Sequence, residues 1–319
     1  MLARAEATGL QKLTRYCAAR TASRSFDSEV VRCAVACVLR LRPDLLRVPD
    51  KFASTAELEE QVRKLAALHP NEGLFEVLFT RRVDDLKDKH SGQVCFPGGK
   101  LDEGENEQVA CEREVFEEIG VDLNQKGLYL GKMTDEAFIY HRSNKKVLIS
   151  ACTYFASNNL QMNLSKTEIS EASWVPMTHF FDYQPNHLRY REYAIPPKLL
   201  INAFCTEQGS AQPEVAGLLA EYKNEVEKDK IQNGLWYFDL PGLSRPLWGI
   251  TQLMASSLIQ VWRNEHYSQA QLVKSQDFCQ RGLEHKTTCQ NPQLAEYISQ
   301  FLRRRSDQFL VQPATLDAL

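Results

Sequence analysis

The sequence predicts an α/β fold, because apolar runs typical of strands are interspersed with segments of helical periodicity. Residues 30–40, 74–80 and 147–155 are short and apolar, and 147–155 (VLISACTYF) is also rich in β-branched side chains, as expected for buried strands. Residues 54–68 have the spacing of an amphipathic helix. An acidic stretch that ends at Gly120 predicts a second helix, with the glycine as its C-terminal stop. Strands and helices in this order favour an α/β architecture.

The helix over residues 54–68 begins with a recognisable capping pattern. Ser54 or Thr55 is the expected N-cap, and Glu57 or Glu59 lies in the first turn. The segment then lies between the first two predicted strands.

The acidic helix carries Glu114, Glu117 and Glu118 on one face, since they are spaced by three and four residues. Like charges one turn apart destabilise a helix by about 0.2–0.5 kcal/mol per pair, and a bound divalent cation would remove this repulsion. Gly98 and Gly99 precede the helix and allow a tight turn and a close approach of the backbone to a phosphate. The alternative is an acidic face that is simply solvated.

The stretch from residue 99 to 121 resembles the Nudix box, and every fixed position of that motif is filled. The resemblance implies hydrolysis of a diphosphate linkage and a Nudix fold, an α/β/α sandwich around a mixed sheet. It also implies that Glu105 and Arg113 pair to brace the loop against the helix. The matching residues are Gly99, Glu105, Arg113, Glu114, Val115, Glu117, Glu118, Gly120 and Val121.

The expected cofactor is Mg²⁺ or Mn²⁺, held by Glu114, Glu117 and Glu118, because hard cations prefer oxygen ligands. Several Nudix enzymes use a further acidic residue outside the box as a metal ligand or to position the attacking water. The segment 167–177 resembles the family element that carries this residue, and Glu168 takes its position with Glu171 as the reserve. A surface turn is the alternative for both. The expected catalytic residues are therefore Glu114, Glu118 and Glu168.

The residues just upstream of the box resemble those of coenzyme A diphosphatases. That subfamily has a Leu-Leu-Thr-x-Arg-Ser element, a basic stretch ending in Gly, and then Phe-Pro-Gly-Gly; here residues 78–82 read LFTRR and residues 90–99 read HSGQVCFPGG. Val83 replaces the Ser, and Asp88 stands where strict spacing asks for Arg. The implied products are 3′,5′-ADP and 4′-phosphopantetheine or its acyl derivative. ADP-ribose, NADH or a dinucleotide is the alternative substrate, and a catalytically silent nucleotide-binding module is the alternative function.

A basic loop beside an acidic helix suits a polyanionic small-molecule substrate. Arginine can pair with two phosphate oxygens, whereas lysine acts as a point charge. An ordinary solvated loop is the alternative, because aspartates lie among the cations. The expected substrate-binding residues are Arg82, Lys87, Lys89, Phe96, Gly98 and Gly99.

The domain organisation predicted is one Nudix domain with appendages. Residues 28–265 form the domain, and residues 246–251 (PLWGIT) resemble the start of its closing helix, over 251–262, which packs on the sheet. Residues 183–234 form an insertion with a charged helix over 214–230, which either covers the substrate cleft or makes a homodimer contact. Residues 266–319 are expected to be a helical tail.

Composition limits the partners and the location. The formal charge of −3 argues against general binding of nucleic acid, and no apolar run reaches the length of about 18–20 residues that spans a membrane. Nine scattered cysteines without a Cys-x-x-Cys pair suggest reduced thiols. Residues 1–27 are basic and poor in acid, which is typical of a mitochondrial transit peptide. An irregular or helical basic extension is the alternative for this segment, and the cytosol and the peroxisome are the alternative locations.

Overall fold

The chain divides into two compact units, and the computed structural model describes most of the first. Unit 1 is Met1–Glu136, Leu148–Leu188 and Tyr237–His266, and unit 2 is Ala137–Val147, Arg189–Trp236 and Tyr267–Leu319. The residues described are 2–20, 30–45, 51–85, 90–140, 145–181, 188–195, 230–247, 249–263 and 286–288, with the single positions 292 and 296.

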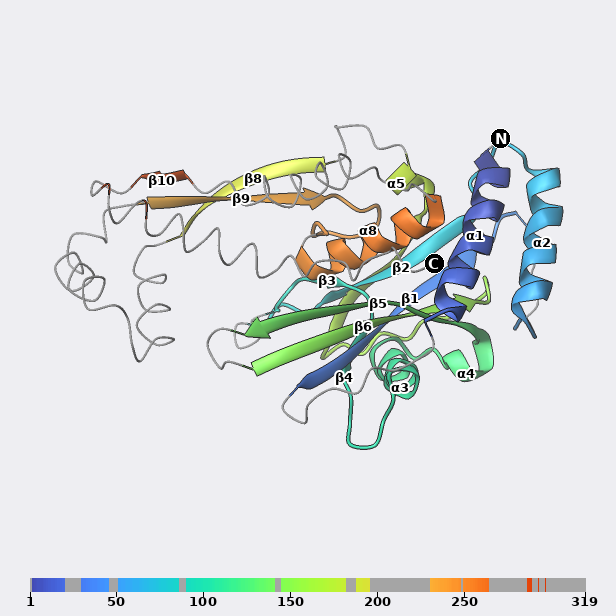
Figure 1. The fold of residues 1–319 in the computed structure, drawn as a ribbon, viewed down its shortest axis with the longest axis horizontal. Helices are drawn as coiled ribbons and strands as arrows, with labels where there is room; N and C mark the ends of the chain where they lie inside the picture. The colour runs from blue at the N-terminus through green and yellow to red at the C-terminus, as the bar shows by residue number, and fades with distance from the viewer. Residues whose placement is uncertain are drawn as a thin grey trace. The chain divides into compact units, whose positions relative to one another are not determined.

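An open sheet forms the centre of unit 1 (Figure 1). It has seven strands in the order β3-β2-β1-β6-β5, with β4 paired to β1 and β7 paired to β2. Strand β2 pairs antiparallel with β1, β3 and β7. The predicted strands are present as β1, β2 and β6. The bounds are β1 Val31–Leu41, β2 Phe75–Arg82, β3 Val94–Cys95, β4 Gly98–Lys100, β5 Gly127–Tyr140, β6 Lys145–Ala156 and β7 Ile169–Pro176.

Both faces of this sheet are buried, because successive side chains of a strand point in opposite directions. On β1, Ala34, Ala36 and Val38 belong to one hydrophobic core, whereas Cys37 and Leu39 belong to the other. Helix α3 (Glu107–Ile119) and the short α4 (Leu123–Lys126) close the first core. The predicted α/β class, with an open sheet between layers of helices, is therefore confirmed.

Three helices cover the opposite face, namely α1 (Leu2–Ala18), α2 (Thr55–Leu68) and α8 (Gly249–Arg263), with the single turn α5 (Thr178–Phe181) beside them. The predicted cap of α2 is Ser54, whose Oγ accepts a hydrogen bond from the Glu57 N–H at 3.2 Å. The predicted closing helix is α8, and its Trp262 packs edge-on against Phe75 of β2 with ring centroids 4.9 Å apart. No helix within these described ranges is both long and apolar enough to cross a membrane.

The N-terminal segment is a packed helix of unit 1, which differs from the extension that its composition suggests. Leu10, Leu13 and Cys17 of α1 are fully buried. Gly9 lies so close to the Trp262 indole that an added Cβ would be 2.3 Å from its Nε1. The basic side chains that resemble a transit peptide thus lie on the outer face of an amphipathic helix whose apolar face is part of the core.

The described part of unit 2 is a small sheet of order β10-β9-β8. Its strands are β8 (Leu188–Ile195), β9 (Lys230–Phe238) and β10 (Lys286–Thr288). The prediction of a helical tail is wrong at 286–288, where the residues pair antiparallel with β9; pairing with a neighbouring strand outweighs local propensity in such a short segment. The helix predicted over 214–230 lies outside the described residues, except for Lys230, which begins β9.

A buried acid ties α1 to the start of β2. The Glu6 carboxyl group is 1 % exposed and accepts a hydrogen bond from the Leu74 N–H. Burial raises the pKa of Glu6 to about 7, against the opposing effects of the Leu74 N–H and the positive charge of Arg42.

We expect this group to make the stability of the protein depend on pH. The Glu6 carboxyl ionises near pH 4.5 in the unfolded chain and near pH 7 in the folded one, so between these values the unfolded state binds fewer protons. The free energy of unfolding should therefore fall as the pH rises through this window, by at most about 3 kcal/mol. Denaturant titrations from pH 4 to 8 measure the slope. Glu6→Gln should make the slope less steep, leaving the part that other buried carboxyl groups contribute, and Glu103→Gln, an exposed control, should not; equal slopes in all three proteins would contradict the assignment.

Candidate active site

Helix α3 begins and ends at well-defined caps. The Asn106 side chain accepts a hydrogen bond from the Val109 N–H at 2.9 Å. Gly120 adopts the left-handed conformation with φ 71°, and its N–H donates to the Phe116 carbonyl. The predicted stop at Gly120 is present, whereas Asn106 was not predicted as the cap. The two caps fix which residues face the sheet.

Glu118 lies at the centre of the site. It is 2 % exposed, and its Oε2 accepts a hydrogen bond from the Gly98 N–H at 3.1 Å. Its other oxygen lies 3.9 Å from Nη1 of Arg82. Burial raises the pKa of Glu118 to about 8, with smaller raising effects from the charges of Glu114 and Glu168, while the Gly98 N–H and Arg82 oppose the rise.

Glu114 and Glu168 lie within electrostatic reach of Glu118. The pKa of Glu114 is raised, first by burial and then by the charges of Glu117 and Glu168, although Arg113 opposes this. Glu168 ends the turn before β7, and its carbonyl accepts a hydrogen bond from the Val83 N–H at 2.8 Å. The four glutamates of the predicted metal and catalytic set therefore gather around one end of α3 and β7.

Arg113 connects the box residues to one another. Its Nε and Nη2 contact the two oxygens of Glu105 at 2.9 and 3.0 Å, which is the predicted pair in bidentate form. Its Nη1 also contacts Glu114 at 2.9 Å and Glu117 at 3.1 Å. The Arg113 guanidinium holds the pKa of Glu105 down at about 2. Arg113 thus neutralises part of the charge on this face.

The donor set suits a hard divalent cation. Among the described residues, no three ligand side chains converge in a metal-binding arrangement, because Glu114 and Glu117 are turned toward Arg113. All four carboxylates nevertheless offer the oxygen ligands that Mg²⁺ and Mn²⁺ prefer. A cation would also offset the charge of the buried Glu118 beside Glu114 and Glu168. The residues that could hold it are Glu114, Glu117, Glu118 and Glu168.

The glycine pair lies against carboxylates instead of facing an open phosphate site. Gly98 has φ 148°, and an added Cβ would lie 2.3 Å from the Ala34 carbonyl oxygen of β1. At Gly99 an added Cβ would lie 2.4 Å from Oε1 of Glu114. The two glycines let the backbone of β4 approach both β1 and α3, which positions Glu114 and Glu118.

The other predicted substrate residues have different outcomes. Arg82 is one-third exposed and points toward Glu118. Phe96 is 1 % exposed and stacks on Phe79 with ring centroids 4.9 Å apart, so its side chain packs in the core instead of facing a ligand. Lys87 and Lys89 lie outside the described residues, as does Asp88.

Glu171, the second candidate for the role expected of Glu168, takes part in a different hydrogen-bond network. Its carboxylate accepts hydrogen bonds from the Ser244 N–H at 2.7 Å and from Arg81 at 3.1 Å. Arg81 is buried and was not singled out from the sequence, because it occupies a variable position of the coenzyme A diphosphatase element. In the sequence, the one sign of a different role for Arg81 is that it precedes Arg82 on a strand, where successive side chains point to opposite faces of the sheet.

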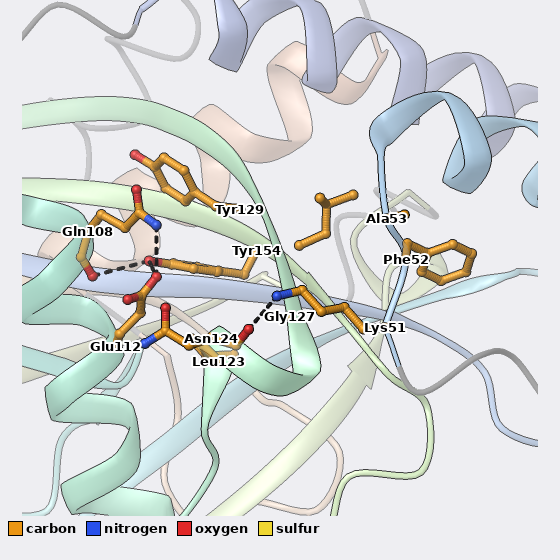
Figure 2. A pocket seen from close by; sticks show the side chains of 11 residues that line it. Lys51, Phe52, Ala53, Gln108, Glu112, Leu123, Asn124, Gly127, Tyr129 and Tyr154 are labelled. Carbon is orange, nitrogen blue, oxygen red and sulfur yellow. Dashed lines mark hydrogen bonds between the residues drawn. The ribbon is translucent and has the colours of Figure 1, made fainter.

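A cavity of about 510 Å³ lies on another side of α3 (Figure 2). Its lining includes Lys51, Gln108, Glu112, Tyr129 and Tyr154. Several of its polar groups are hydrogen-bonded to one another. The side-chain amide of Gln108 donates to Glu112 at 2.9 Å, and the Tyr154 hydroxyl donates to the backbone carbonyl of Gln108 at 3.2 Å. At about 100° per residue, position 112 lies roughly 120–160° around the helix from 114, 117 and 118, so the Glu112 side of this cavity is separate from the candidate active site.

Comparison with known proteins agrees with this geometry. Residues 63–195 match the NUDIX domain. The chain is 31 % identical over 151 residues to "Peroxisomal coenzyme A diphosphatase ndx-8" of Caenorhabditis elegans, covering 46 % of this chain and 62 % of that protein. It is 30 % identical over 113 residues to "Peroxisomal coenzyme A diphosphatase NUDT7" of Mus musculus, covering 35 % of this chain and 45 % of that one. The chain thus spans less than two thirds of either relative.

Among solved structures, the chain is similar to a MutT protein from Methanosarcina mazei Go1, with 19 % identity and a TM-score of 0.32 over 50 % of this chain and 86 % of that one.

The two glycines should respond differently to the same substitution. Gly98→Ala places a methyl group against backbone at a positive φ, and should lower the free energy of unfolding by about 2–3 kcal/mol. Gly99→Ala meets only the mobile end of Glu114, so stability should change by less than about 1 kcal/mol while Mn²⁺ affinity falls about tenfold, or about 1.4 kcal/mol. Thermal unfolding and calorimetric Mn²⁺ titration test both. Equal behaviour of the two variants would argue against the different contacts of these glycines.

Proposed function

We propose that this chain, which carries a NUDIX domain over residues 63–195, is a metal-dependent diphosphate hydrolase. The observation that carries the proposal is the buried Glu118, held by the Gly98 N–H and surrounded by Glu114 and Glu168. Glu114 and Glu117 contact Arg113 in this structure, so in this proposal they turn from the guanidinium to join Glu118 as oxygen ligands of the cation. A purely structural acidic face would leave its carboxylates in solvent.

The residues of the site have separate tasks in this proposal. Glu114, Glu117 and Glu118 hold Mg²⁺ or Mn²⁺, and Glu168 positions the attacking water. When bound, the cation neutralises the diphosphate and lowers the pKa of a bound water. Glu105 holds Arg113, which in turn positions Glu114 and Glu117. Arg82 binds the substrate phosphates. Water adds to one phosphorus as the bridging P–O bond breaks, so two phosphomonoesters leave.

Coenzyme A or an acyl derivative is the substrate that we propose. The names of both relatives support this substrate, as does the LFTRR and FPGG context of Arg82 and Gly98. The products would be 3′,5′-ADP and 4′-phosphopantetheine or its acyl form.

The packing of α1 bears on the location of the protein. Residues 2–18 form part of the core of unit 1, so removing them as a cleaved leader would expose apolar surface around Trp262. This packing argues against the mitochondrial interpretation of residues 1–27, and the names of the two relatives support the peroxisomal alternative.

One incubation tests the activity and the substrate together. Purified protein is mixed with coenzyme A, acetyl-coenzyme A, ADP-ribose, NADH and a dinucleoside polyphosphate, with Mg²⁺, Mn²⁺ or EDTA, and the products are identified by mass. We expect 3′,5′-ADP from the coenzyme A species only when a cation is present. Turnover of another compound alone would reassign the substrate, and binding without any turnover would indicate a silent module.

Glu118→Gln should separate folding from catalysis. The amide oxygen can still accept the Gly98 N–H, so the melting temperature should stay within a few degrees of the wild type. Turnover should fall by at least about a hundredfold, because a neutral amide is a poor cation ligand. Glu112→Gln, on the same helix but facing the separate cavity, serves as the control and should keep near wild-type rates. Near wild-type turnover by Glu118→Gln at saturating Mg²⁺ would reject the assignment.

A further inference from the structure

Strand β7 contains an irregularity next to the candidate active site. Its pairing with β2 is regular from Glu76 to Arg81, and the register then shifts so that Arg82 faces Ile169, which leaves Ser170 as the extra residue of a bulge in β7. Such β-bulges bend a strand and change the direction of a side chain, often beside active sites. Here the shift falls between Arg81, on the α8 side of the sheet, and Arg82, on the α3 side.

Ser170 binds both carbonyls at the bulge. Its hydroxyl lies 3.1 Å from the Arg81 carbonyl oxygen and 3.2 Å from that of Arg82, and it can donate to either. The same oxygen accepts a hydrogen bond from Nη1 of Arg81 at 2.8 Å. One side chain of β7 therefore bridges the backbone of β2 at the position of the shift.

Arg81 links this contact, directly or through its partners, to three further segments: Asp84 after β2, the turn at Gly92 and the residues around Ser244. Its guanidinium contacts Glu171 of β7 at 3.1 Å and also pairs with Asp84, which follows β2. Gly92 has φ 65° and no room for a side chain, since an added Cβ would lie 2.5 Å from Oδ1 of Asp84. Glu171 in turn accepts hydrogen bonds from Ser244. Arg81 itself is only 7 % exposed, whereas the Asp84 side chain is 61 % exposed.

We propose that Arg81 is a positioning residue, which through Ser170 and Glu171 fixes the β7 bulge against β2, so that Arg82 and Glu168 face Glu118. The link to Glu168 is short, because the Val83 N–H, just after the bulge, donates to the Glu168 carbonyl at 2.8 Å. Arg82 reaches Glu118 from the same turn. The role of Arg81 in substrate binding rests on the proposed diphosphatase function, whereas its role in holding the bulge does not.

The chain offers a matched control in Arg40. This residue is also part of a shielded arginine–glutamate pair between neighbouring strands, with Nη2 2.7 Å from Glu76, and it lies over the Trp174 ring at 4.1 Å. These contacts, to Glu76 of β2 and Trp174 of β7, lie several residues away from the register shift at Arg81 and Arg82. Arg40→Gln should therefore cost stability without moving Arg82.

The test compares Arg81→Gln, Arg81→Lys, Ser170→Ala and Arg40→Gln in the full chain, well below their melting temperatures. Arg81→Gln should raise KM for coenzyme A about tenfold with kcat changed less than threefold, Arg81→Lys should recover part of this loss, and Ser170→Ala should raise KM about threefold. Arg40→Gln should leave KM unchanged. A purely structural role would reduce the active fraction and kcat but leave KM at the wild-type value.

Hydrogen exchange gives a second readout that needs no activity. Peptides containing Val83 and Ser244 should exchange at least tenfold faster in Arg81→Gln than in Arg40→Gln. Unchanged exchange at Val83, or unchanged KM in a folded Arg81→Gln, would overturn the proposal; if that variant does not fold, Ser170→Ala decides by the same two measurements. If the wild type hydrolyses no diphosphate, the proposed function fails, and the exchange rates still decide whether Arg81 holds the bulge.

Discussion

A carboxylate that is shielded from water must be stabilised by the groups around it, and Glu118 imposes this requirement on the whole site. One of its oxygens receives the Gly98 N–H and the other faces Arg82. The Gly98 contact requires β4 to run within hydrogen-bonding distance of α3 while it also pairs with β1. No side chain fits there, so the glycine pair, the small residues Ala34 and Ala36 below it and the position of α3 follow from one packing requirement.

The carboxylates on the same side of α3 could repel one another enough to weaken the helix, and Arg113 prevents this. It contacts Glu105, Glu114 and Glu117 at once. The loop before the helix is thereby tied to its middle, and the charges that remain least compensated are those of Glu118 and its neighbours. A cation entering the site would compete with Arg113 for Glu114 and Glu117, so its affinity depends on how readily those two side chains rotate away from the guanidinium.

Local patterns in the sequence were enough to predict the main elements and the carboxylate face. The spacing of Glu114, Glu117 and Glu118 defines a helix face whatever surrounds it, and Ser54 and Gly120 are short-range capping signals. Other features depend on contacts between distant segments. Phe96 stacks on Phe79, which lies 17 positions earlier in the chain, Gly98 and Gly99 lie against Glu118 and Glu114 of α3, and the strand at 286–288 exists through its pairing with β9.

The two consecutive arginines of β2 illustrate how one sheet serves two layers. In a regular strand Arg81 and Arg82 point to opposite faces, so only Arg82 can approach the carboxylates of α3. Arg81 instead contacts Ser170 and Glu171 on the neighbouring strand. Because the β7 bulge lies opposite the step between the two arginines, the position of Arg82 relative to Glu168 depends on how firmly Arg81 holds the two strands together. The electrostatic environment of Glu118 is thus set from both faces of the sheet, although only one face carries the catalytic helix.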